Sequence, residues 1–230
     1  MSDAVSLQVN IDRDEVLRYL GYKGQSVTEE MSALIDRQMS SCKKLAKPGY
    51  LYGRYDVCDN DGGVYLQDTG IVLVGKDISA HLNGCCYCVL MAVTCGMGVE
   101  RELLRLQRMS MTEAVVFDAC ANAYVESLAD CVQRIIEQEA AENGRYINYR
   151  YSPGYGDFPL DMQRVIVPAM QCEKRIGLTV TDKALLVPHK SVTAVVGVFD
   201  YKKDTSRGGC EKCNMYDRCN IRKAGNRCDR

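Results

Sequence analysis

The stretch from residue 85 to residue 94 constrains the fold most, because nearly every side chain in it is apolar. A strand with one face in water alternates apolar and polar residues, whereas a strand buried on both faces is apolar throughout. We therefore expect residues 85–94 to form a central, buried strand. Its cysteines, Cys85, Cys86 and Cys88, would then serve as small hydrophobic side chains.

Shorter strands are expected on either side of this run. Turn-forming sequences separate them, such as Asn-Asp-Gly-Gly at 60–63 and Asn-Gly at 83–84. Closely spaced strands with short turns favour antiparallel pairing, so we expect an α+β fold around an antiparallel or mixed sheet. The expected strands cover residues 50–57, 64–67, 71–74, 178–180, 184–187 and 191–199.

Helices are expected wherever apolar residues recur with a period of 3.6. Ser26 and Glu29 have the spacing of a capping box, which predicts a helix start there and an end at Pro48. Pro168 should kink the last helix or start a second segment. The other expected helices cover residues 12–20, 99–109, 112–142 and 161–175. Small residues at 119–123 allow the 112–142 helix to approach a sheet or another helix closely.

Length and composition exclude several classes of protein. The chain has 230 residues and a net charge of −1, so it lacks the basic excess of nucleic-acid-binding proteins. No run approaches the ~18 apolar residues of a transmembrane helix. The N-terminus lacks the basic and apolar regions of a signal peptide. We expect a cytoplasmic protein that binds neither nucleic acid nor membranes.

The end of the chain is rich in cysteine. The chain has 13 cysteines, an odd number, and in a reducing cytosol these are usually free thiols or metal ligands. Four of them, Cys210, Cys213, Cys219 and Cys228, have a spacing that suits a tetrahedral site for zinc or an iron–sulfur cluster. The spacing does not choose between these metals, and a tail with incidental thiols is the alternative.

The clearest binding chemistry lies in residues 150–159, which read Arg-Tyr-Ser-Pro-Gly-Tyr-Gly-Asp-Phe-Pro. Pro153 stiffens this loop, while Gly154 and Gly156 permit positive φ or close approach of another group. Arg150 and exposed backbone N–H groups could hold a small anionic or zwitterionic ligand. The alternative is a plain connector between two elements. No P-loop, nucleophile elbow or zinc-protease motif occurs.

Two carboxylates on the preceding helix extend this hypothesis. Glu126 and Asp130 are four residues apart, so they share one helix face. One of them could meet the ammonium group of a zwitterion whose carboxylate Arg150 binds. A solvated helix face is the alternative.

The loop resembles a known family at this point. Arg150, followed by Pro153-Gly154-Tyr155 and then Pro159 and Asp161, is similar to the S-adenosylmethionine-binding loop of the activation domain of cobalamin-dependent methionine synthase, with one extra residue before the aspartate. The sequences at 119–130 and 177–192 resemble the family's long helix and later strands. The resemblance covers most of residues 10–200.

The resemblance implies the fold of that domain and a set of ligand contacts. Arg150 would bind the carboxylate of S-adenosylmethionine, Glu126 would approach its amino group, and the loop backbone would line the pocket. Asp12 is the candidate for an acidic contact near the N-terminus. The implied binding residues are Asp12, Glu126, Arg150, Ser152, Pro153, Gly154 and Tyr155.

The resemblance also implies a reaction and partners. The domain would support reductive remethylation of cob(II)alamin, with S-adenosylmethionine as methyl donor and a flavodoxin-like protein as electron donor. No cobalamin-binding region fits within the chain, so the cobalamin would belong to a partner methionine synthase that lacks its own activation domain. Half of this methyltransferase site would then lie on the partner chain. We expect residues 1–205 to form the binding domain and residues 206–230 a Cys-rich tail.

Two other functions remain open at this stage. The chain could be an iron–sulfur electron-transfer protein whose tail is the active part, or a non-catalytic docking module that caps a corrinoid enzyme. Neither of these functions requires the Arg150 loop.

The tail hypothesis can be tested by metal analysis. Protein purified without oxygen should contain about one zinc or one iron–sulfur cluster per chain, because four thiolates satisfy either centre. Replacing Cys210 and Cys213 by serine should remove the metal. Intact protein that contains neither zinc nor iron would contradict the hypothesis.

Overall fold

The computed structural model describes residues 7–60 and 62–203, so the predicted Cys-rich tail and its boundary near residue 205 lie outside the described residues. The helices are α1 (Arg13–Tyr19), α2 (Glu29–Leu45), α3 (Lys76–Leu82), α4 (Met97–Met109), α5 (Met111–Glu142), α6 (Gln163–Ala169) and α7 (Cys172–Ile176), with a 3-10 turn at Leu160–Met162. The strands are β1 (Gly49–Tyr55), β2 (Val57–Asn60), β3 (Gly63–Leu66), β4 (Ile71–Val74), β5 (Tyr87–Thr94), β6 (Tyr146–Ile147), β7 (Thr179–Val180), β8 (Leu186–Val187) and β9 (Ser191–Phe199).

The main sheet has the strand order β1-β5-β9-β6, and each pair of neighbours is antiparallel. Strand β5 therefore lies inside the sheet, as its apolar sequence predicts. It begins at Tyr87, so Cys85 and Cys86 lie outside the strand and are not buried, whereas Cys88 is. The α+β prediction is confirmed, and the sheet is antiparallel.

Both faces of β5 and β9 are covered, because successive side chains of a strand point to opposite faces. Val89, Met91 and Val93 join one hydrophobic core with α5, α2 and α4. Leu90 and Ala92 join a second core with α3, α6, β3 and β4. The two small antiparallel sheets, β2-β3-β4 and β7-β8, complete the layer on this second face.

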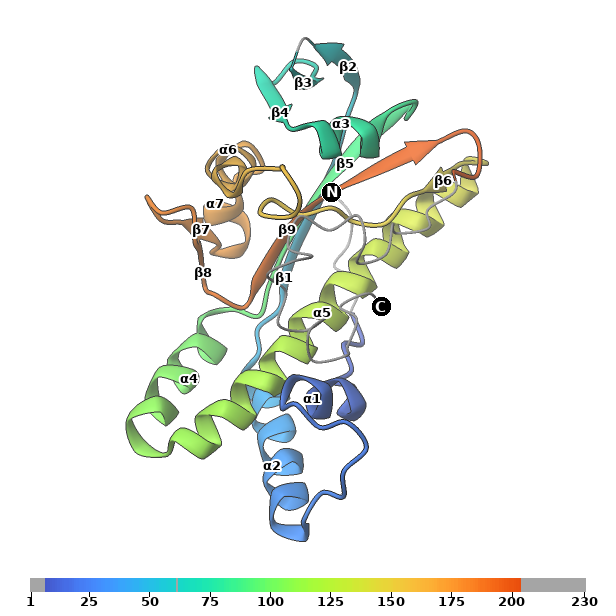
Figure 1. Ribbon diagram of the computed structural model, residues 1–230. Helices are drawn as coiled ribbons and strands as arrows, with labels where there is room; N and C mark the ends of the chain where they lie inside the picture. The colour runs from blue at the N-terminus through green and yellow to red at the C-terminus, as the bar shows by residue number, and fades with distance from the viewer. Residues whose placement is uncertain (1–6, 61, 204–230) are drawn as a thin grey trace.

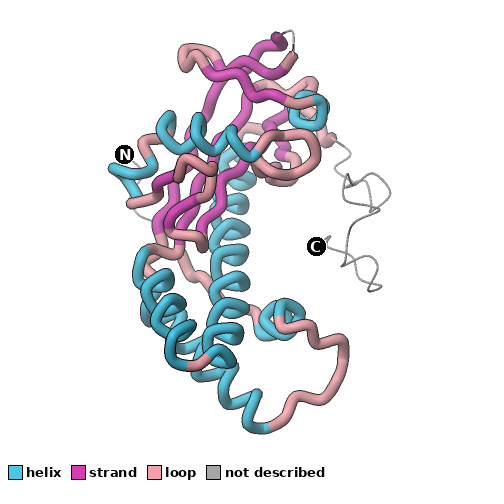
Figure 2. The backbone as a smooth tube through the Cα atoms, turned by 60° about the vertical axis from the view of Figure 1, so that its left-hand side comes forward, coloured by secondary structure: helices cyan, strands magenta, loops and turns pink. Residues whose placement is uncertain are grey.

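Helix α5 is the longest element. Its 32 residues span ~48 Å, so it runs along the main sheet and continues beyond it to contact α1, α2 and α4 (Figures 1 and 2). The Ser110 hydroxyl caps its first turn by accepting from the Glu113 N–H. Ala119, Ala121 and Ala123 are buried, as expected for residues that allow close packing.

Several local predictions differ from the structure. The expected 50–57 strand is split at position 56 into β1 and β2, and α3 and β6 were not predicted. Thr28, rather than Ser26, caps α2. The expected 161–175 helix is broken after Met170, where Gln171 has a φ of 53°. Pro168 lies inside α6, so the break comes three residues after the proline.

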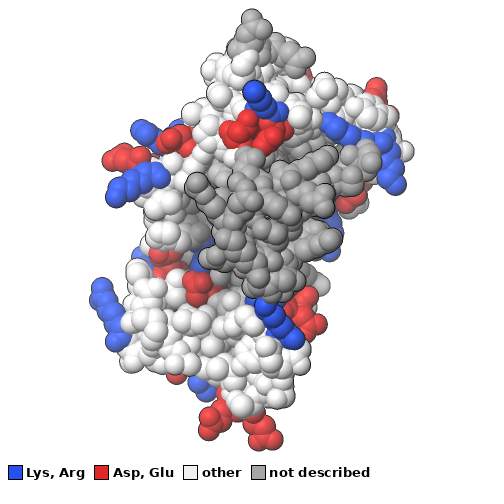
Figure 3. All heavy atoms as spheres, in the orientation of Figure 1, with Lys and Arg blue, Asp and Glu red and all other residues white. Residues whose placement is uncertain are grey.

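Charged side chains do not form one large patch on the face shown in Figure 3, where acidic and basic groups are interspersed among the described residues. Within the described ranges, the chain has no helix with the length and apolar character needed to cross a bilayer.

The burial of α5 against the sheet can be tested with two leucines. Leu128 is fully buried in this helix, and its replacement by alanine should lower the free energy of unfolding by about 2–5 kcal/mol. Leu104 on α4 is 49% exposed, and the same substitution there should cost less than about 1 kcal/mol. Urea unfolding of both variants measures the difference, and equal losses would contradict the assigned packing.

Candidate functional site

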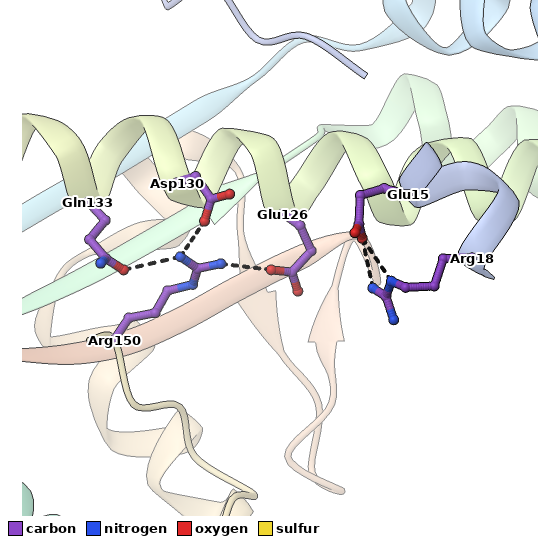
Figure 4. A network of polar contacts seen from close by, with 6 residues as sticks. All are labelled: Glu15, Arg18, Glu126, Asp130, Gln133 and Arg150. Carbon is purple, nitrogen blue, oxygen red and sulfur yellow. Dashed lines mark hydrogen bonds and ion pairs between the residues drawn. The ribbon is translucent and has the colours of Figure 1, made fainter. Parts of the chain in front are cut away.

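Arg150 lies between the sheet and α5, where three side chains of the helix bind its guanidinium group (Figure 4). Its Nη1 atom donates to Asp130 Oδ1 at 2.6 Å and to Gln133 Oε1 at 3.1 Å. Its Nη2 atom donates to Glu126 Oε2 at 2.8 Å. The shared face predicted for Glu126 and Asp130 is therefore confirmed, and it is not simply solvated: both carboxylates bind one arginine.

The members of this ion cluster differ in solvent exposure: the arginine is mostly buried, whereas the two carboxylates on the helix are partly exposed. The Arg150 side chain is 13% exposed, whereas those of Glu126 and Asp130 are 31% and 45% exposed. Burial alone would lower the pKa of Arg150, but Asp130 and Glu126 offset this, and the pKa is raised. Arg150 is thus a permanent cation whose neutralising carboxylates can reach water.

The backbone of residues 148–151 holds Arg150 beside β9. Tyr151 exchanges two backbone hydrogen bonds with Val195, at 2.9 and 2.8 Å. The buried Asn148 side chain accepts from the Gly197 N–H at 2.7 Å and donates to the His81 carbonyl at 2.9 Å. These bonds make the Arg150 backbone part of the rigid sheet.

A second cation lies farther along the same face of α5. Lys190, in the loop before β9, contacts Asp118 Oδ1 and Asn122 Oδ1, each at 2.7 Å. The α5 residues that bind Lys190 or Arg150 form a stripe spaced by three or four positions: Asp118, Asn122, Glu126, Asp130 and Gln133. Four of these residues were not predicted from the sequence, although the four-residue spacing is a signal for those on the helix: Lys190, Asp118, Asn122 and Gln133.

Backbone geometry shapes the loop that follows Arg150. The N–H groups of Gly154 and Tyr155 donate to the carbonyls of Phe158 and Ser152, so they close turns inside the loop. These two N–H groups therefore have acceptors within the loop, and a ligand contact by the loop backbone stays a prediction. Pro153 is buried, whereas Gly154 and Tyr155 are exposed and Ser152 is half-buried.

A reciprocal set of hydrogen bonds fastens the loop to α3. The Asp157 carboxylate accepts from the N–H groups of Lys76 and Asp77, at 2.8 and 2.9 Å, while Asp77 Oδ2 accepts from the Asp157 N–H at 3.1 Å. The N–H groups of Asp77 and Lys76 lower the pKa of Asp157. The loop is therefore held at both ends, by β9 and by α3.

Aromatic rings fill the space under the loop. The Tyr151 ring stacks on Phe158 with centroids 6.1 Å apart, and it also contacts His81 and Tyr155. Burial and the Asp77 carboxylate raise the pKa of Tyr151 to about 12, so its phenol stays neutral at physiological pH. Tyr155 is 66% exposed and presents its ring at the surface of the loop.

Two acidic residues of the α1 region, Asp12 and Glu15, have different partners in the structure. The Asp12 side chain accepts from the Asp14 N–H at 2.8 Å and caps α1. Glu15, one turn later, projects toward the face of α5 that carries Glu126, and it binds Arg18 at 2.8 Å (Figure 4). Asp12 thus has a partner within α1, and its contact with a ligand stays a prediction. Glu15 is the α1 carboxylate drawn beside Glu126 in Figure 4.

Two surface depressions of about 200 Å³ each are lined by residues outside the Arg150 cluster. One, between β1 and the α6–α7 turn, shares no residue with the Arg150 cluster. The other is lined by α1, α4 and α5 and reaches Asp118 and Asn122 of the stripe. Within the described part of the chain, no group of three or more His, Cys, Asp or Glu side chains is placed to hold a metal ion.

The arrangement suits a small ligand that carries both charges. Arg150 can bind a carboxylate, and the three nearby acids Glu15, Glu126 and Asp130 can bind cationic groups. The site can therefore orient a zwitterion.

Comparison with known proteins identifies the family. Residues 77–207, more than half of the chain, match the family model described as vitamin B12 dependent methionine synthase, activation domain. The chain belongs to this family. Comparison with curated protein sequences gives no significant match.

A solved structure shares the activation-domain fold. It is described as the MetH reactivation domain bound to AdoHcy, with a TM-score of 0.60 and 15% identity over 92% of this chain and 80% of that chain. At this identity, the likeness concerns the fold. The likeness extends over more of the chain than the matched family segment does.

The steric need for glycine in the loop can be tested. A Cβ on Gly156 would lie 2.1 Å from Asp77 Oδ2 and 2.3 Å from the Tyr151 hydroxyl. Gly156→Ala should therefore add an overpacking cost of about 1–3 kcal/mol to the strain of its positive φ. Gly144→Ala is the matched control, because Gly144 has a similar φ of +66° and nothing within 4 Å. Thermal unfolding compares the two, and equal losses would show that Asp77 and Tyr151 do not restrict this position.

Proposed function

We propose that this chain binds S-adenosylmethionine at Arg150 and supports reductive remethylation of cob(II)alamin carried by a partner methionine synthase. One observation carries the proposal. Arg150 is fixed to the sheet while the carboxylates of Glu126 and Asp130 lie within 3 Å of its guanidinium group. The matched family supplies the reaction class.

The charges of S-adenosylmethionine match those of the site. Its amino acid end carries a carboxylate, which Arg150 can bind with charge-assisted hydrogen bonds. Its ammonium and sulfonium groups are cations, and Glu126 and Glu15 lie on the same side of α5 to receive them. The exposed Tyr155 and the loop from Ser152 to Gly154 would border the remainder of the ligand.

The ligand of the related structure supports this assignment. That structure is described as holding AdoHcy, the molecule left when S-adenosylmethionine gives up its methyl group. The ion cluster of this chain is suited to the amino acid part that both molecules share. The role of this chain would be to hold the sulfonium methyl group in line with its acceptor.

The proposed reaction needs two further proteins. One electron, from a flavodoxin-like donor, would reduce cob(II)alamin, and the methyl group would then pass from the sulfonium sulfur to cobalt, leaving S-adenosylhomocysteine. The matched family is the activation domain of a vitamin B12 dependent enzyme, and we assign the cobalamin to a partner methionine synthase without its own activation domain. Such a reaction belongs to methionine biosynthesis, and we place it in the cytoplasm.

The tail offers a second contribution. We keep zinc or an iron–sulfur cluster at Cys210, Cys213, Cys219 and Cys228 as a proposal, either as an electron-transfer centre or as a docking element for the corrinoid enzyme. The Arg150 cluster favours the methyl-donor function, because electron transfer through the tail does not need it.

Arginine substitution tests ligand binding directly. Arg150→Ala should weaken S-adenosylmethionine binding by about 1.5–3 kcal/mol, the contribution of hydrogen bonds to a charged group. Arg150→Lys should recover only part of this, because a lysine cannot form the planar fork. Isothermal titration measures both affinities.

Arg105→Ala is the matched control, because Arg105 forms an exposed ion pair with Glu102 on α4. It should bind like the wild type. Equal affinity of the Arg150 variants and the wild type, with all proteins folded by thermal unfolding, would remove Arg150 from the site. Absence of binding by the wild type, also with a cobalamin-loaded methionine synthase present, would contradict the proposed function.

A further inference from the structure

We propose that Asp130 occupies the position on Arg150 that the ligand carboxylate takes, so that binding exchanges one carboxylate for another. This inference rests on the proposed binding of S-adenosylmethionine at Arg150. It assigns to Asp130 a specific role in setting affinity, because its ion pair with Arg150 must break before the ligand is held.

The bonding of Arg150 motivates the proposal. Both outer nitrogens of the guanidinium already donate to acceptors on α5, Nη1 to Asp130 and Gln133 and Nη2 to Glu126. The Asp130 contact, at 2.6 Å, is the shortest of the three. A carboxylate that arrives from solvent meets an arginine that is 13% exposed and already neutralised.

Asp130 is better suited to leave than Glu126. Its side chain is 45% exposed, compared with 31% for Glu126, so it can rotate toward water with less loss of packing. Gln133 accepts from the same Nη1 atom at 3.1 Å and can keep the guanidinium oriented during the exchange. Glu126 would stay in place for the ammonium group.

Long-range electrostatics predicts the opposite effect of removing Asp130, which makes the inference testable. The cluster in Figure 4 contains three acids, Glu15, Glu126 and Asp130, and two arginines, Arg18 and Arg150. S-adenosylmethionine has one anionic and two cationic groups. If only the electrostatic potential of the cluster matters, removal of an acidic residue should weaken the binding of S-adenosylmethionine, which carries a net positive charge. Exchange predicts tighter binding.

The first test is titration of S-adenosylmethionine into Asp130→Asn. Affinity should rise by roughly fivefold, which corresponds to the ~1 kcal/mol of a half-exposed ion pair. Gln133→Glu should lower affinity, because it places another carboxylate on Nη1. Glu137→Gln is the control for charge alone, since Glu137 is exposed on the same helix two turns away, and its affinity should be unchanged or slightly lower.

The second test uses decarboxylated S-adenosylmethionine, which lacks the group that would replace Asp130. Asp130→Asn should bind this analogue no better than the wild type does. A gain for the complete ligand and none for the analogue supports the exchange, whereas an equal gain for both ligands overturns it.

The two proposals can fail separately. If the wild type binds S-adenosylmethionine through Arg150 and Asp130→Asn binds it equally or more weakly, the exchange is wrong and the proposed function stands. If neither the wild type nor Asp130→Asn binds the ligand, with or without a cobalamin-loaded partner, both proposals are wrong.

Discussion

The burial of both faces of β5 and β9 is the constraint on which the rest of the structure depends. A sheet that is apolar on both faces must lie between two covering layers. Helix α5 covers one face, and α3, α6 and the small sheets cover the other. Helix α5 extends beyond the edge of the sheet, and its protruding part contacts α1, α2 and α4. One helix thus links the core to the helices at the far end of the molecule.

The candidate site follows from the same arrangement. The buried residues of α5 are fixed by packing, and this also fixes the direction of the polar stripe that binds Lys190 and Arg150. Arg150 and Lys190 reach that stripe from segments beside and before β9. Each cation is sheltered by the sheet, while its acidic partners stay partly in water. A charged ligand can therefore bind between α5 and the main sheet without leaving a buried charge unpaired.

The loop after Arg150 is held by contacts distant in sequence. Asp157 binds the first N–H groups of α3, and Gly156 lies so close to Asp77 and Tyr151 that no larger residue fits without a shift. This explains why a loop with two prolines and two glycines has a defined shape. It also explains why α3 was not predicted: its seven residues give a weak periodic signal, and a carboxylate 80 positions later completes its first turn.

Local periodicity in the amino-acid sequence is enough to predict the fold class, the central strand, the long helix and the shared face of Glu126 and Asp130. The loop motif in the sequence also pointed to Arg150. Three features depend on the packed chain: the contacts of Arg150 with both carboxylates, the contact of Lys190 with the same stripe, and the approach of Glu15 to the Glu126 face of α5. The physical reason is that side chains four residues apart on a helix share a face whatever the fold, whereas contacts between α1, α5 and the segments around β9 require the packed core that brings them together.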